Sequence, residues 1–163
     1  MSELRPPNQG IDQLKLDAFL ADSVVKSGGK LHALGIGWDQ LSAQSFPARH
    51  SRLSLGVVVT VPYLDTDSGH ELRVRFQDAD GNALAFGGRA PQPGETDKRP
   101  TMIKARLPQT RGDDPAPGDE RTITLAINLD GLVFSGPGRY RFLLEIDGAP
   151  QKRLAFRVVQ AAS

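Results

Sequence analysis

Two short acidic segments hold the side chains best suited to bind a hard cation. Asp78 and Asp80 stand at alternate positions just ahead of Gly81, as in the opening of a calcium-binding loop. Asp65 and Asp67 show the same spacing in a second segment. If both segments meet at one end of the folded domain, these four carboxylates form a candidate calcium site.

A simpler interpretation of the same segments is a turn. An EF-hand loop that begins at Asp78 requires a glutamate at its twelfth position, and that position is Arg89. The pair Asp80-Gly81 is a favoured hairpin turn, and the aspartates near residue 65 fit a solvated loop. We therefore expect no metal and no other cofactor.

Arginines at alternate positions of predicted strands form the second candidate surface. Side chains two residues apart along a strand share one face, here the face opposite the apolar residues. The six residues are Arg73, Arg75, Arg139, Arg141, Arg153 and Arg157. Lys104 and Arg106 follow the same alternation. If these strands are neighbours, the basic face can bind phosphate, RNA or an acidic protein.

Acidic residues interrupt this pattern and leave an alternative open. Glu71, Glu145 and Asp147 are interspersed among the arginines. No aromatic residue shares the predicted face, as an RNA-stacking platform requires. An ordinary solvated face with cross-strand ion pairs is the simpler interpretation.

The sequence contains no recognisable catalytic motif. His32, His50 and His70 lie in separate segments without the spacing of metal ligands. No phosphate-binding loop or G-x-S-x-G nucleophile turn occurs. The tripeptide Arg111-Gly112-Asp113 has the integrin-binding pattern, but three common residues often fall together by chance. We therefore predict that the protein is not an enzyme.

The elements that carry these residues are predicted to be β-strands. Apolar residues alternate with polar ones over 72–76, 123–129, 140–146 and 154–158, which indicates half-buried strands. Residues 53–61 are partly apolar on both faces and predict a central strand, and residues 101–107 predict a further one. Glycine and proline turns recur about every ten residues, and no long helix is indicated. The expected fold is an all-β antiparallel sandwich, immunoglobulin-like or C2-like, with about nine strands.

Three turn signals predict hairpins. Gly28-Gly29 separates residues 19–25 from 31–38, Asp80-Gly81 precedes Leu84, and Asp147-Gly148 joins the two halves of 139–159. Trp38, the only tryptophan, is expected to end the second strand. It can serve as an anchor at the margin of the core or cap a ligand groove, and we favour the anchor.

Composition limits the remaining possibilities. The length of 163 residues predicts one domain, which we place over 16–160. We expect residues 1–15 to form a flexible segment ahead of it. Its net charge is +1, and it has no cysteine for disulfides, thiolate metal sites or nucleophiles. The longest apolar run, residues 57–59, is too short to cross a bilayer, and residues 1–10 lack the apolar core of a signal peptide. We expect a cytoplasmic protein with no membrane partner.

Several sequence blocks resemble a known family. Residues 17–22 and 29–38 are the most specific, and residues 61–63, 78–81 and 137–140 are also similar. The resemblance spans about residues 16–158 and is to a family of small uncharacterised actinobacterial proteins, known only as a domain of unknown function. It implies a β-sandwich fold and no particular chemistry.

Three functions remain open from the sequence. The favoured one is a non-catalytic protein-interaction or binding module, with another protein as the expected partner. The first alternative is an anion or nucleic-acid binder that uses the arginine-rich sheet face. The second is a calcium-dependent C2-like module that uses the acidic segments. Strand order and oligomeric state are not predicted.

Overall fold

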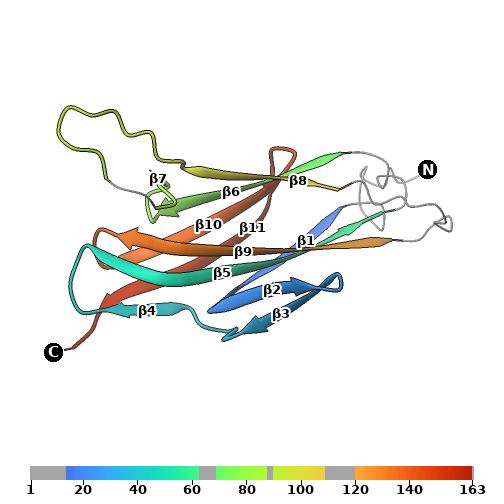
Figure 1. Cartoon of the computed structure of the whole chain (residues 1–163), viewed down its shortest axis with the longest axis horizontal. Helices are drawn as coiled ribbons and strands as arrows, with labels where there is room; N and C mark the ends of the chain where they lie inside the picture. Colours follow the sequence, from blue (N-terminus) through green and yellow to red (C-terminus); the bar gives the residue numbers. More distant parts are fainter. Residues whose placement is uncertain (1–13, 63–68, 88–89, 109–119, 163) are drawn as a thin grey trace, which may run out of the picture.

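Strands account for all the regular structure that the described residues contain. The computed structural model describes residues 14–62, 69–87, 90–108 and 120–162, and these form eleven β-strands (Figure 1). The prediction of an all-β fold is confirmed, but the predicted number of about nine strands was wrong. The chain breaks the first predicted strand into two at Asp22 and adds a short strand before residue 44.

A three-stranded antiparallel sheet is built around the predicted central strand. Its order is β1-β5-β9, with bounds β1 Lys15–Ala21, β5 Ala48–Val61 and β9 Arg121–Phe134. The apolar residues of β5 that face the core stand opposite apolar residues of β9, as in the pairs Leu55↔Ile127 and Val57↔Leu125. On the other face, the Phe19 ring lies over Gly56, where any side chain would collide with it.

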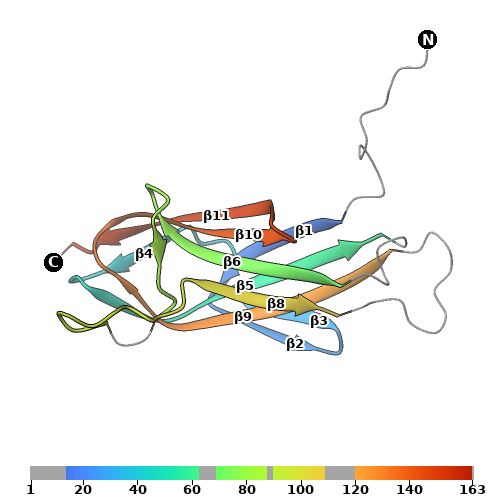
Figure 2. The same cartoon turned by 90° about the horizontal axis from the view of Figure 1, so that it is seen from above.

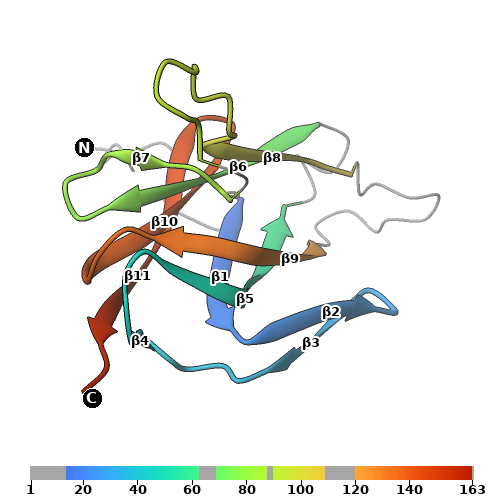
Figure 3. The same ribbon diagram turned by 60° about the vertical axis from the view of Figure 1, so that its left-hand side comes forward.

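A six-stranded sheet holds all the predicted arginine-bearing strands. Its order is β4-β11-β10-β6-β7, and β8 also pairs with β6. The bounds are β4 Gln40–Ala43, β6 His70–Asp78, β7 Ala83–Leu84, β8 Met102–Leu107, β10 Gly138–Ile146 and β11 Ala149–Gln160. The pairs of this sheet are antiparallel as predicted, except that the short β4 pairs in parallel with the end of β11; Figure 3 shows β4 near the C-terminus.

The two sheets share one apolar core. Phe134 of β9 makes ring contacts with Phe76 of β6 and Tyr140 of β10, at centroid distances of 5.9 and 4.9 Å. Phe142 stacks on Phe76 at 5.2 Å, and both side chains are fully buried. Figure 2 shows the strands of the two sheets from above. This core fixes which face of each strand is left to solvent.

A third, two-stranded sheet covers the other side of the three-stranded sheet. It is the hairpin of β2 Ser23–Ser27 and β3 Lys30–Leu34. Val24 is fully buried beneath it, and the Asn128 side chain donates to the Val24 carbonyl and accepts from its amide, at 3.0 and 3.3 Å. The predicted hairpin at Gly28-Gly29 is confirmed, but it begins after β1 and ends before Trp38.

The other two predicted hairpins are confirmed. β10 and β11 turn at Asp147-Gly148, where both residues have positive φ values of 51° and 83°. This conformation suits a two-residue hairpin turn and favours Asp-Gly. β6 and β7 turn near Gly81, and only two residue pairs follow.

Candidate basic sheet face

The strand order places all six predicted arginines on one continuous surface. In β-sheets, residues directly opposite each other on neighbouring strands share a face. The register pairs Arg139 with Arg157 across β10 and β11, and Glu145 with Arg73 across β10 and β6. It also pairs Arg73 with Lys104 across β6 and β8. The face turned away from the core is therefore basic from β11 to β8, and we call it the basic sheet face.

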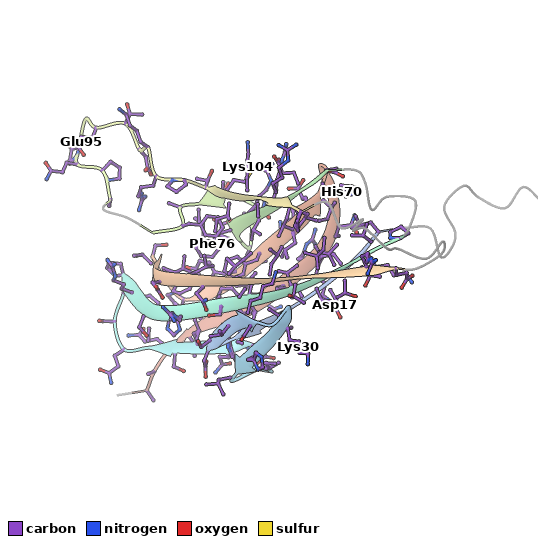
Figure 4. All side chains as sticks on the ribbon, turned by 45° about the vertical axis from the view of Figure 1, so that its right-hand side comes forward. Asp17, Lys30, His70, Phe76, Glu95 and Lys104 are labelled. Atoms are coloured by element: carbon purple, nitrogen blue, oxygen red, sulfur yellow. The ribbon has the colours of Figure 1, made fainter. Side chains whose placement is uncertain are left out.

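Eight basic side chains share this face with two strand carboxylates, Glu71 and Glu145. The basic residues are Arg73, Arg75, Lys104, Arg106, Arg139, Arg141, Arg153 and Arg157. Figure 4 shows Lys104 on the solvent side of the sheet and Phe76 on the core side. The sequence analysis left open whether the arginine-bearing strands are neighbours, and the register shows that they are.

One part of the face, which we call the paired half, contains Arg73, Arg75, Lys104 and Arg106 with both carboxylates. Arg75 Nε lies 2.6 Å from Glu145 Oε1, and the Glu145 side chain is only 10% exposed. Arg73 Nε lies 2.6 Å from Glu71 Oε1. The hydrogen bond from Arg73 lowers the pKa of Glu71, and the same bond raises the pKa of Arg73. Much of the positive charge of this half is therefore neutralised within the protein.

The turn at Asp147 borders the paired half. Asp147 Oδ2 lies 2.7 Å from His70 Nδ1, and Oδ1 accepts the Glu71 amide at 2.9 Å. Burial raises the pKa of Asp147, but the hydrogen bonds from His70 and Glu71 outweigh it, so the pKa is lowered. His70 is thereby a structural neighbour of the hairpin turn and not part of a histidine cluster.

The other part of the face, which we call the open half, contains Arg139, Arg141, Arg153 and Arg157. None of the four makes an ion pair with a described residue. Arg141 Nε donates to the neutral amide oxygen of Gln77 at 2.9 Å, and its charge also lowers the pKa of Asp78. Arg139, Arg153 and Arg157 are exposed. The open half therefore presents its charge to solvent.

Among the residues that the structure describes, the face lacks the features of a base-stacking platform. Its uncharged members include Met102 on β8, Leu143 on β10, Ala155 and Val159 on β11, and Gln77 on β6. Every aromatic side chain of these four strands lies on the core face, among them Phe76, Phe142 and Phe156. The arrangement can bind anionic groups but offers no ring on which a nucleobase could stack.

The predicted acidic site is described only in part. Asp65 and Asp67 lie outside the described residues. The Asp78 carboxylate accepts hydrogen bonds from the Asp80 and Asn82 amides and the Asn82 side chain, at 2.9 to 3.1 Å. The hydrogen bond from the Asn82 side chain is the main cause of the lowered pKa of Asp78. In the part of the chain that the structure describes, no three metal-ligating side chains come together.

The remaining sequence candidates are dispersed. His32, in β3, is exposed opposite Val25, and His50, in β5, stands opposite Leu132. Residues 111–113, the integrin-like tripeptide, lie outside the described residues. The three histidines thus occupy three different sheets, and no two of them form a pair.

Trp38 packs against the core as the anchor interpretation predicts. Its ring meets Phe156 edge-on at a centroid distance of 5.7 Å. The prediction that Trp38 ends a strand was wrong, because β3 stops at Leu34. The indole Nε1 is buried and has no hydrogen-bond partner among the described residues.

Sequence reasoning missed the partners that divide the face into halves. The contacts Arg75–Glu145 and Arg141–Gln77 join residues 70 and 64 positions apart. No local spacing indicates such contacts. Only the strand order β11-β10-β6-β8 brings these residues together. The alternation of apolar and polar residues predicts which face of a strand a side chain occupies, but it does not predict which strands pair with each other.

A comparison with family models identifies the chain. The model described as Family of unknown function (DUF6941) matches residues 16–159. The chain belongs to this family. The match confirms the prediction that the chain belongs to a family of unknown function. It covers β1 to nearly the end of β11, so every strand of the basic sheet face lies within the matched region. No curated protein matches the chain.

Among the described residues, no helix is long and apolar enough to span a bilayer.

Proposed function

We propose that this member of the DUF6941 family is a non-catalytic binding module whose contact surface is the basic sheet face. The observation that carries the proposal is the gathering of eight basic side chains against two strand carboxylates on one solvent-facing surface. The whole chain has a net charge of only +1, so this face concentrates charge that composition alone conceals. Such a surface attracts an acidic partner and orients it.

An acidic protein is the partner that best fits this face. Guanidinium groups bind carboxylates through two parallel hydrogen bonds, and arginine is enriched in protein interfaces. Nucleic acid is the less favoured ligand because the described strands place no aromatic residue on this face. The calcium-dependent alternative has less support, because Asp78 already accepts hydrogen bonds within its own turn.

We also propose that the domain is a β-sandwich of the immunoglobulin-like kind. Two sheets of three and six strands share the aromatic core described above. The buried Tyr140, near the start of β10, donates its hydroxyl to the Gly136 carbonyl at 2.7 Å. This contact has the form of a tyrosine corner, which immunoglobulin-like sandwiches use before a late strand. Such sandwiches commonly serve as binding modules.

Binding of labelled poly-L-glutamate, followed by fluorescence anisotropy at about 50 mM salt, tests the proposed function. The informative variant is Lys104→Gln with Arg153→Gln, one residue from each half of the face. Each exposed charge pair contributes up to about 1 kcal/mol, so we expect binding to weaken about fivefold.

The matched control is Lys26→Gln with Lys30→Gln on the β2–β3 hairpin, which removes the same charge from another surface. We expect the control to bind nearly as the parent does. If the control and the face variant weaken binding equally, or if the parent does not bind at low salt, the proposed function is wrong. Melting curves of both variants should match the parent, because all four side chains are exposed.

A further inference from the structure

Two arginines of the open half lie directly opposite each other. Arg139 of β10 and Arg157 of β11 form a cross-strand pair, and the Cβ atoms of such pairs are about 5 Å apart. Like charges in this arrangement repel and destabilise the sheet. No carboxylate of a described residue forms an ion pair with either arginine. An anion bound between them would relieve this repulsion.

The surface beside this pair is open to a ligand. Residues 137–139 and 157–160 line a depression of about 530 Å³. The side chains of Arg139 and Arg157 are both exposed. A group that enters from solvent can therefore reach both guanidinium groups without displacing a protein contact.

The neighbouring residues extend the positive site. Ala155 lies between Arg153 and Arg157 on the same face of β11, and it stands opposite Arg141. Its small side chain leaves space at the centre of the four arginines. The hydrogen bond to Gln77 holds the Arg141 guanidinium at 2.9 Å without neutralising it.

We infer that Arg139 and Arg157 bind a phosphate monoester carried by the protein partner, such as a phosphoserine side chain. This inference rests on the proposed function. A carboxylate has two oxygens, which one guanidinium fork satisfies. A phosphate monoester has three terminal oxygens and a charge between about −1.5 and −2, so it can serve two forks at once. A nucleotide fits less well, because the described strands offer its base no aromatic ring on this face.

Three versions of one acidic peptide test the inference. They differ only at a central position, which is serine, phosphoserine or glutamate. Their affinities are measured by fluorescence anisotropy at constant ionic strength. For the parent protein, we expect the phosphoserine peptide to bind about tenfold more tightly than the glutamate peptide.

Two variants with equal charge change locate the site. Arg139→Gln with Arg157→Gln should abolish the preference for phosphoserine. Lys104→Gln with Arg106→Gln, in the paired half, should lower the affinity for all three peptides by the same factor and keep the preference for phosphoserine. Arg139→Lys with Arg157→Lys keeps the charge but removes the fork, so it should keep glutamate affinity and lose most of the preference.

The outcomes separate this inference from the proposed function. Equal affinity of the parent for phosphoserine and glutamate peptides, or a preference that survives Arg139→Gln with Arg157→Gln, overturns the inference alone. Failure of all three peptides to bind overturns the proposed function as well. If inorganic phosphate or adenosine monophosphate binds as tightly as the phosphoserine peptide, the assignment to a protein-borne phosphate is wrong.

Discussion

The two halves of the basic sheet face use the same residue type in opposite ways. In the paired half, the Arg75 and Arg73 guanidinium groups each lie 2.6 Å from a carboxylate. In the open half, Arg139, Arg153 and Arg157 have no such partner among the described residues. The two halves lie on the same sheet, so the difference comes from the neighbouring side chains and not from the backbone.

This difference indicates what each half contributes to stability and to ligand binding. A carboxylate that is largely buried loses its water and must keep its cationic partner, so the Arg75–Glu145 pair is tied to folding. Exposed arginines without partners stabilise little and stay free to meet a ligand. We therefore expect the largest loss of stability from substitutions in the Arg75–Glu145 pair, and we expect the exposed arginines of the open half to act mainly in binding.

The largest expected effect comes from breaking the paired half at Glu145. Glu145→Gln keeps the side-chain shape but leaves the Arg75 charge without its partner on a partly buried face. We expect the free energy of unfolding to fall by about 1–3 kcal/mol, measured by urea denaturation.

The control for this change is Asp130→Asn. Asp130 pairs with Arg52 at 2.7 Å, but both side chains are exposed, at 61% and 46%. The loss of stability should be clearly smaller than for Glu145→Gln. If the two losses are equal, burial does not distinguish the paired half and the comparison fails.

A smaller effect, of the opposite sign, is expected in the open half. Arg157→Glu places a carboxylate directly opposite Arg139 and converts a repelling pair into an attracting one. The thermal midpoint should rise, because such cross-strand pairs contribute about 0.2–1 kcal/mol. Poly-L-glutamate binding should weaken at the same time. A lower midpoint would show that the parent pair is not repulsive.

The smallest effect is a change in acid sensitivity at the border of the paired half. The folded pKa of Asp147 lies below its unfolded value of about 3.9. Its contribution to stability is therefore present above about pH 4 and is lost as the pH falls through the folded pKa. Asp147→Asn removes this contribution, and asparagine tolerates the φ of 51°.

Urea midpoints between about pH 2.5 and 6 measure this change. The variant should be less stable than the parent near pH 6, and the gap should narrow below about pH 4. If the difference in urea midpoint between parent and variant is constant over this pH range, the ionisation of Asp147 does not contribute to stability.

The strand faces were predictable from sequence because one side of each strand faces the apolar core and the other faces solvent. The alternation of Leu72, Val74 and Phe76 with charged residues assigned the outward arginines of β6 correctly. The same held for β10 and β11, whose turn is marked by Asp147-Gly148. Local chemistry was sufficient wherever a two-residue period and a turn signal coincided.

Other elements were not predictable because their causes are distant in sequence. Neither glycine nor proline marks the break at Asp22 between β1 and β2, where the Asp22 amide donates to the Leu34 carbonyl at 2.9 Å. β4 has only four residues and forms by pairing with β11, more than 100 positions away. The division of the basic face likewise depends on contacts such as Arg75–Glu145, which join separate strands.

The outermost strands of the six-stranded sheet have a further consequence for assembly. On one side, the four-residue β4 pairs with Arg157–Gln160 of β11, and the remaining part of β11, which β4 does not cover, carries Lys152 and Arg153. On the other side, β7 has two residues, and β8 carries Lys104 and Arg106. Short outer strands and lysine both oppose the addition of a strand from a second molecule. The sheet is therefore protected against edge-to-edge aggregation while its broad charged face stays accessible.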